Sequence, residues 1–151
     1  MDFLKIKLNG INEQGIEQKY SLKNFAGQNI ILYFYPKDNT SGCTQEACDF
    51  RDNFNRLTSK ATVIGVSPDS IASHIKFQEK NNLNFILLSD PEHFLAEAFN
   101  VWQEKSMYGK KYMGIVRSTF FIDRNGKIEK EWRKVKVKGH VDEILIYINK
   151  Q

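Results

Sequence analysis

The sequence is poor in cysteine and proline and has no long apolar run. Two cysteines and three prolines occur in 151 residues, which excludes a small secreted scaffold held by several disulfides. No segment approaches the roughly 20 consecutive apolar residues that a membrane-spanning helix needs. The N-terminus also lacks the apolar core of a secretory signal, because Asp2 is followed by alternating apolar and polar residues. We therefore expect a soluble, cytoplasmic protein without a membrane partner, whose thiols are kept reduced.

The length and the charge are those of an ordinary globular domain. The chain has no repeat, linker or low-complexity stretch, so we expect a single domain over residues 1–151. The net charge is +4, and the main basic run is RKVKVKGH at 133–140. Its lysines alternate with valines and have no aromatic or reader motif among them. This pattern favours the exposed face of a strand, and we expect no nucleic-acid partner.

Strand and helix signals alternate along most of the chain. Apolar runs that predict buried strands occupy residues 29–36, 61–68 and 84–90. Apolar spacing or capping signals predict helices over 43–57, 70–81, 91–99 and 140–150. Hairpins are predicted from 3–10 with 16–20, and from 117–123 with 127–133 around an Asn-Gly turn. This order indicates a three-layer α/β fold in which helices cover both faces of a mixed central sheet, with a β-hairpin at the N-terminus.

Both cysteines follow the first predicted buried strand and a polar turn. Cys43 falls in the first turn of the next helix, where the helix dipole and free N–H groups favour a thiolate. A stabilised thiolate is also a weaker nucleophile, so the net gain in reactivity is only about threefold. Fast chemistry would need donors aimed at the substrate, such as the Thr40 hydroxyl and an arginine. The residues alone do not choose among Arg51, Arg56, Arg117, Arg124 and Arg133.

The spacing of Cys43 and Cys48 prevents a ready-made disulfide within a helix. Five helical residues turn the chain by about 140° and advance it by about 7.5 Å, which puts the Cα atoms about 8.7 Å apart. A disulfide tolerates about 6.8 Å at most. A bond between the two sulfurs therefore requires the first turns of the helix to unwind.

Four interpretations of this cysteine pair can be weighed on the residues alone. A zinc site is disfavoured, because His74, His93 and His140 lie on separate predicted elements and no C-x2-C spacing occurs. A thioredoxin-type oxidoreductase would show C-x-x-C rather than C-x4-C. A redox-active Cys43 and a pair of unreactive thiols are both compatible with the spacing, although the polar, helix-capping neighbours of Cys43 favour reactivity.

The segment YPKDNTSGCTQEACDFRD at 35–52 resembles the active site of the peroxiredoxins, and most closely the bacterioferritin-comigratory, PrxQ-like group of thiol peroxidases. Pro36, Thr40 and Cys43 match the family motif P-x3-T-x2-C, and Cys48 matches the resolving cysteine of one branch. The segment VRSTFFID at 116–123 is similar to the one that brings an arginine to the reactive cysteine. The resemblance implies a thioredoxin-like fold.

The resemblance also implies a role for each matching residue. Cys43 would be the peroxidatic nucleophile, which attacks a hydroperoxide and becomes a sulfenic acid. Thr40 would hydrogen-bond the sulfur and the peroxide, and Pro36 would shield the sulfenate. Arg117 would stabilise the developing charge, and Glu46 would orient Arg117.

In the same way, the resemblance implies how the cycle is completed. Cys48 would form an intramolecular disulfide with Cys43, and a thioredoxin or glutaredoxin-like protein would reduce it, without a cofactor or metal. We expect a monomer or weak homodimer that reduces hydrogen peroxide and organic hydroperoxides. The alternative is a peroxide-sensing switch or chaperone-like binding protein that uses the same cysteines. Relatives often carry proline where this chain has Ser41, and we expect the serine hydroxyl to cap the helix instead.

Overall fold

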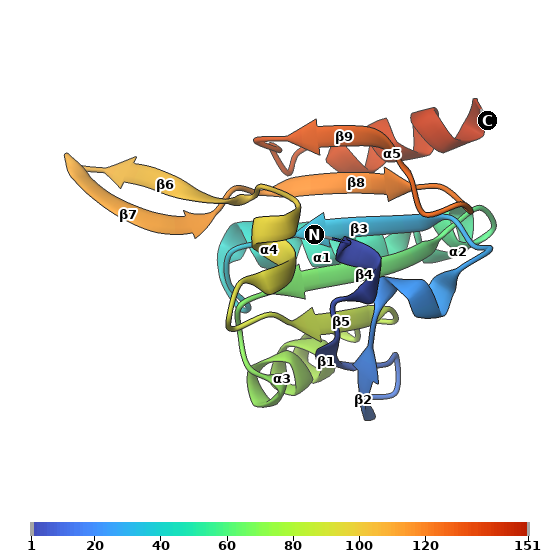
Figure 1. Ribbon diagram of the computed structural model, residues 1–151, viewed down its shortest axis with the longest axis horizontal. Coiled ribbons are helices and arrows are strands. Elements are labelled where there is room, and N and C mark those ends of the chain that lie inside the picture. Colours follow the sequence, from blue (N-terminus) through green and yellow to red (C-terminus); the bar gives the residue numbers. More distant parts are fainter. Residues whose placement is uncertain (1, 151) are drawn as a thin grey trace.

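A seven-stranded mixed sheet forms the centre of the molecule (Figure 1). The computed structural model describes residues 2–150, and the strand order is β2-β1-β5-β4-β3-β8-β9. The central strands β3 (Ile30–Phe34), β4 (Thr62–Ser67) and β5 (Ile86–Ser89) are parallel. Antiparallel strands extend this sheet on both sides, namely β1 (Leu8–Ile11), β2 (Glu17–Tyr20), β8 (Ser118–Ile122) and β9 (Ile128–Arg133). The predicted mixed sheet and the hairpin of β8 and β9 are therefore confirmed. The N-terminal hairpin is also present, but its first strand begins at Leu8 rather than Phe3, because residues 3–5 form a 3-10 helix.

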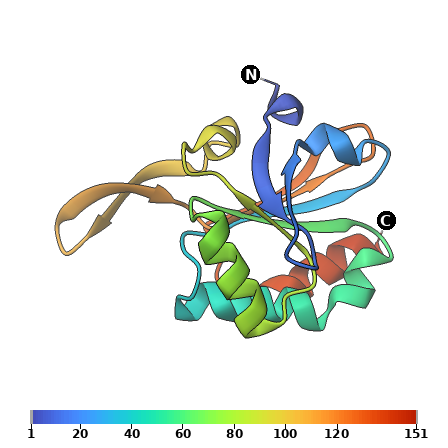
Figure 2. The same cartoon turned by 90° about the horizontal axis from the view of Figure 1, so that it is seen from below.

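Helices cover the two faces of this sheet unevenly (Figure 2). The helices that contribute to the core on one face are α1 (Ser41–Asp52), α2 (Phe54–Thr58), α3 (Ile71–Asn81) and α5 (His140–Asn149). The opposite core contains α4 (Phe94–Ala98) and two short 3-10 helices, η1 (Phe3–Lys5) and η2 (Leu22–Phe25). Every residue of β3 is buried, because its continuous apolar run faces both cores. The expectation of helices on both faces is confirmed.

Two of the predicted helices have different bounds. The helix expected over 43–57 is broken at Asn53, whose backbone leaves the helical region and whose Nδ2 donates to the Asp49 carbonyl at 2.9 Å. The helix expected from Pro91 begins only at Phe94, because His93 adopts a left-handed conformation with φ of 62°. Asp90 still caps this helix from a distance, since its Oδ2 accepts from the Ala96 amide at 2.9 Å.

The strand predicted within the basic run at 133–140 is wrong. Strand β9 ends at Arg133, and the following Lys134 has a φ of 51°, which a strand cannot contain. The three lysines of the run are nevertheless exposed, while the valines between them are half-buried. The alternation thus reports which side chains face water, although the backbone is a loop.

A further hairpin projects from the body of the molecule and was not predicted (Figure 1). It pairs β6 (Trp102–Met107) with β7 (Lys110–Ile115) as a separate two-stranded sheet. Its turn residues, Tyr108 and Gly109, both have positive φ, as a two-residue hairpin turn requires. Tyr108, at the tip of this hairpin, is 98% exposed.

The described residues contain neither a membrane-spanning helix nor a metal-binding cluster. Between residues 2 and 150, no helix is long and apolar enough to cross a membrane. Within the same range, no cluster of three or more histidine, cysteine or acidic side chains is arranged to hold a metal ion.

Candidate active site

The candidate site lies where β3 ends and α1 begins. In open α/β sheets, ligands commonly bind at this junction, because the carboxyl ends of parallel strands meet the N-termini of helices there. The loop at 35–40 connects the two elements. Thr40 is the N-cap residue of α1, but its hydroxyl donates to the Lys37 carbonyl at 2.8 Å and makes no capping bond. Ser41 is the first helical residue, so its expected capping role is not realised.

Cys43 lies on the inner side of α1 and is 2% exposed. It shares this side with Ala47 and Phe50, at the spacing that turns a helical stripe towards a core. The sulfur accepts a hydrogen bond from Nη2 of Arg117 at 3.3 Å. A guanidinium in that position can stabilise negative charge that develops beside it.

Arg117 joins Cys43 to a buried acid. Its Nη1 donates to Oε1 of Glu46 at 2.7 Å, while Nη2 contacts the sulfur. A Cβ atom at Gly42 would lie 3.4 Å from Nη2, so the glycine leaves room for the guanidinium over the first turn of α1. Arg51 and Arg133, by contrast, donate to backbone carbonyls elsewhere. Of the arginines that the residues left open, the structure brings Arg117 to Cys43.

Burial dominates the electrostatics of the Glu46–Arg117 pair. Burial raises the pKa of Glu46 from its ordinary value to about 7, although Arg117 opposes the shift. Burial alone would lower the pKa of Arg117, but Glu46 and Cys43 together raise it. Near neutral pH the ion pair is therefore close to losing its negative partner. The second oxygen of Glu46 has no hydrogen-bond partner among the described residues.

A second cation reaches the site from the projecting hairpin. Lys105 is half-buried, whereas the residues from 106 to 113 are all exposed. The side chain of Lys105 lies across β7, because a Cβ atom at Gly114 would be 3.1 Å from Lys105 Cδ. Burial and the nearby Arg117 lower the pKa of Lys105, and Cys43 opposes that shift. The sequence analysis missed Lys105, because the hairpin that carries it was not predicted.

The remaining candidate residues lie in the loop at 35–40 and on α1. Pro36 is half-buried directly after the strand, and Thr40 is exposed at the start of α1. Cys48 is half-buried, and both thiols are free. Because Cys43 and Cys48 belong to one continuous helix, Ser41–Asp52, they point about 140° apart around its axis. The structure thus holds the two cysteines apart.

Known proteins of one family are similar to this chain in sequence and in fold. Residues 3–131 match the model of the AhpC/TSA family. Peroxiredoxin Bcp of Bacillus subtilis is 61% identical over 125 residues, which is 82% of this chain and 80% of the relative. Peroxiredoxin Bcp of Escherichia coli is 44% identical over 132 residues, 87% of this chain and 85% of the relative.

The chain belongs to the AhpC/TSA family and is a peroxiredoxin of the Bcp type. A solved structure of the bacterioferritin comigratory protein of Xanthomonas campestris superposes with a TM-score of 0.91 and 38% identity, and covers 98% of this chain and 92% of the other. The thioredoxin-like fold expected for this peroxiredoxin is therefore confirmed.

Proposed function

We propose that this peroxiredoxin reduces hydroperoxides with Cys43 as the peroxidatic residue and Cys48 as the resolving residue. The observation that carries the proposal is the contact of the Cys43 sulfur with Arg117 at the N-terminus of α1. It puts a positive, hydrogen-bonding group beside a thiol at the N-terminus of a helix, where the free N–H groups also stabilise developing negative charge.

The proposed first step is an attack of the thiolate on the terminal oxygen of the hydroperoxide. The O–O bond breaks, the sulfur becomes a sulfenic acid and the leaving alkoxide takes up a proton to give an alcohol. Arg117 stabilises the charge that moves from sulfur to the leaving oxygen. Thr40 hydrogen-bonds the reacting atoms, Pro36 shields the sulfenate, and Glu46 orients Arg117.

The proposed second step joins the two cysteines. The Cys48 thiol attacks the sulfenic sulfur, water leaves and a disulfide forms. The first turns of α1 unwind for this step, because the two Cα atoms of an intact helix are too far apart for the bond. A dithiol reductant then exchanges with the disulfide and restores both thiols. We propose a thioredoxin or glutaredoxin-like protein in this role, in the cytoplasm, with the enzyme as a monomer or weak homodimer.

Organic hydroperoxides are included among the proposed substrates, together with hydrogen peroxide. The structure of the Xanthomonas protein was described for its alkyl peroxide reduction activity. In this chain, Met107 and Tyr112 lie on the same face of the projecting hairpin as Lys105 and are exposed. They give this face of the hairpin exposed apolar surface.

The test is turnover combined with intact mass. With peroxide, thioredoxin, thioredoxin reductase and NADPH, we expect steady NADPH consumption; oxidation that stops after one equivalent would indicate the sensing switch instead. One equivalent of peroxide should lower the mass by about 2 Da through disulfide formation. Cys43→Ser should abolish the reaction. Cys48→Ser should still form sulfenic acid but lose turnover, and full turnover of that variant would contradict the resolving role.

A further inference from the structure

A buried polar cluster joins the active-site loop to α3 through hydrogen bonds that do not involve the Cys43 sulfur. Asp38, midway between Pro36 and Thr40, is 5% exposed, and His74 of α3 is 0% exposed. Oδ1 of Asp38 accepts from the Tyr35 hydroxyl at 2.7 Å. Oδ2 accepts from the Ser73 hydroxyl at 2.8 Å and lies 2.7 Å from Nδ1 of His74. The carboxylate is thus held by three side chains.

His74 links this carboxylate to the central sheet. Its Nε2 lies 2.8 Å from the Leu88 carbonyl of β5, and a carbonyl only accepts, so Nε2 carries a proton. Both ring nitrogens are satisfied, and a satisfied buried network is rigid.

The backbone of Asp38 is held as well. Its amide donates to Oδ2 of Asp69 at 2.6 Å. Asp69 is itself fixed, because its amide donates to the Ser67 hydroxyl at 3.2 Å and its carbonyl accepts from the Ser89 hydroxyl at 2.5 Å. The loop before α1 is therefore bound to the ends of β4 and β5 and to α3.

The other end of α1 has a separate attachment. Nη1 of Arg51 donates to the Asn81 carbonyl at the end of α3 at 2.7 Å. Between the two attachments lie Cys43 and Cys48, the residues that have to approach each other. Unwinding between fixed ends lets the helix refold onto the same loop after each cycle.

We propose that the Asp38–His74 pair anchors the loop at 36–40, so that Pro36 and Thr40 keep their positions while the first turns of α1 unwind and refold. Asp38 and His74 are positioning residues, since they act on the peroxide only through the loop. The proposal rests on the proposed function, because it assigns the anchor to that catalytic cycle. A buried, polar pair suits this task, because its hydrogen bonds form in only one loop geometry, whereas apolar packing is compatible with several.

The anchor can be tested with graded variants. Ser73→Ala and Tyr35→Phe each remove one hydrogen bond from Asp38 and keep the pair, whereas His74→Leu removes the pair. Stopped-flow fluorescence gives the rate constant for Cys43 oxidation and the rate of disulfide formation separately. We expect oxidation to slow by about two- to tenfold for each single-bond variant, the factor that one hydrogen bond represents, and further for His74→Leu. Disulfide formation should not slow.

The control is Ile148→Val, which removes a buried methylene in α5 and leaves the loop intact. It should change neither rate. If Ser73→Ala and Tyr35→Phe oxidise within twofold of the wild-type rate, or if both steps slow equally, the anchor is refuted. These two variants decide the question even where His74→Leu fails to fold. A wild-type protein that does not react with peroxide would refute the proposed function instead.

Amide hydrogen exchange of the oxidised protein provides a second readout. In the wild-type disulfide form, the Asp38 amide should stay protected while amides of residues 41–48 exchange rapidly. In Ser73→Ala the Asp38 amide should lose protection in the disulfide form. Equal exchange of the loop and the first turns of α1 in the wild type would overturn the anchor.

Discussion

At the residue scale, the guanidinium of Arg117 contacts the sulfur with one nitrogen and the Glu46 carboxylate with another. A lysine has one nitrogen and cannot hold both partners in this geometry. Arg117→Lys should therefore slow Cys43 oxidation by about 100-fold, the lower range for loss of a donor to developing charge. Stopped-flow fluorescence measures this rate. Arg124→Lys, at an exposed turn, should react like the wild type. A rate for Arg117→Lys within threefold of the wild type would show that charge alone suffices.

Lys105 adds a second positive charge that faces Arg117 and Cys43. Removal of this charge should weaken the attraction for negative charge in the site. Lys105→Met should therefore slow Cys43 oxidation by about three- to tenfold at low salt. The difference from the wild-type rate should shrink as the salt concentration rises. The rate is measured against ionic strength. Lys111→Met is the matched control, because it removes the same charge from the opposite face of the hairpin, where Lys111 lies 3.6 Å from Glu104. Equal effects of the two variants would contradict a specific role for Lys105.

Some of these residues could be found from sequence and others could not. Cys43 stood out because a strand end, a polar turn and a helical stripe meet there. Arg117 is 74 positions away from Cys43, and no local pattern says which arginine crosses that distance; only the resemblance selected it. His74 was considered only as a metal ligand. A histidine on the buried face of α3 with Phe77 is a signal of a buried polar partner, but the partner itself is set by the tertiary fold.

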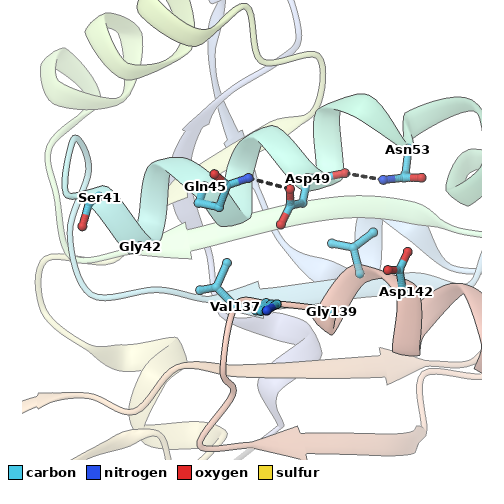
Figure 3. Close-up of a pocket in the computed structure, with 10 residues that line it drawn as sticks. Ser41, Gly42, Gln45, Asp49, Asn53, Val137, Gly139 and Asp142 are labelled. Carbon is cyan, nitrogen blue, oxygen red and sulfur yellow. Dashed lines mark hydrogen bonds between the residues drawn. The ribbon is translucent and has the colours of Figure 1, made fainter.

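At the element scale, the proposed cycle requires α1 to be stable enough to hold Cys43 and weak enough to unwind. Its N-cap has no side-chain capping bond, which lowers the cost of opening the first turn. A groove of about 660 Å³ runs beside this helix, lined by Ser41, Gln45 and Asp49 and by residues at the start of α5 (Figure 3). Cys43 points away from it, into the core. The groove leaves space next to the segment that unwinds.

Ser41→Pro tests the balance between the helical and unwound forms of α1. Proline is favoured at the first helical position, and Thr40 already has the extended conformation, φ −91° and ψ 156°, that a following proline requires. The substitution lowers the conformational entropy of the unwound segment, which disfavours the unwound form by about 0.4–1 kcal/mol. Disulfide formation should therefore slow by about two- to fivefold, and overoxidation to sulfinic acid, measured by intact mass, should rise in proportion. Ser41→Ala is the control. A faster disulfide step in Ser41→Pro would refute unwinding from this end.

The elements themselves were predicted where the pattern was long and local. The buried strands were predicted from apolar runs, and α3 and α5 were predicted from their capping residues and apolar faces. The prediction failed where one residue decides the backbone, as Asn53 does between α1 and α2 and His93 before α4. It also missed β6 and β7, because a two-stranded hairpin outside the sheet has no buried alternation to detect.

At the scale of the whole molecule, the fold buries an acid that would otherwise be exposed on a helix. Glu46 is 1% exposed, and its pKa is about 7 because burial outweighs the attraction of Arg117. In the unfolded chain the pKa returns to about 4.3. At a pH between these two pKa values, Glu46 therefore holds its proton in the folded state and has released it in the unfolded state. The stability that this proton contributes is complete below about pH 4.3 and is lost as the pH rises through 7.

This linkage predicts that the free energy of unfolding falls with rising pH through Glu46. The loss is about 3 kcal/mol between pH 4.5 and 8, at about 1.4 kcal/mol for each unit of pKa shift. Glu46→Gln removes the titration, so its unfolding free energy, measured by denaturant at each pH, should decline less by this amount. Glu79→Gln, at an exposed position of α3, should follow the wild-type curve. Parallel curves for the wild type and Glu46→Gln would mean that Arg117 keeps Glu46 ionised throughout this range.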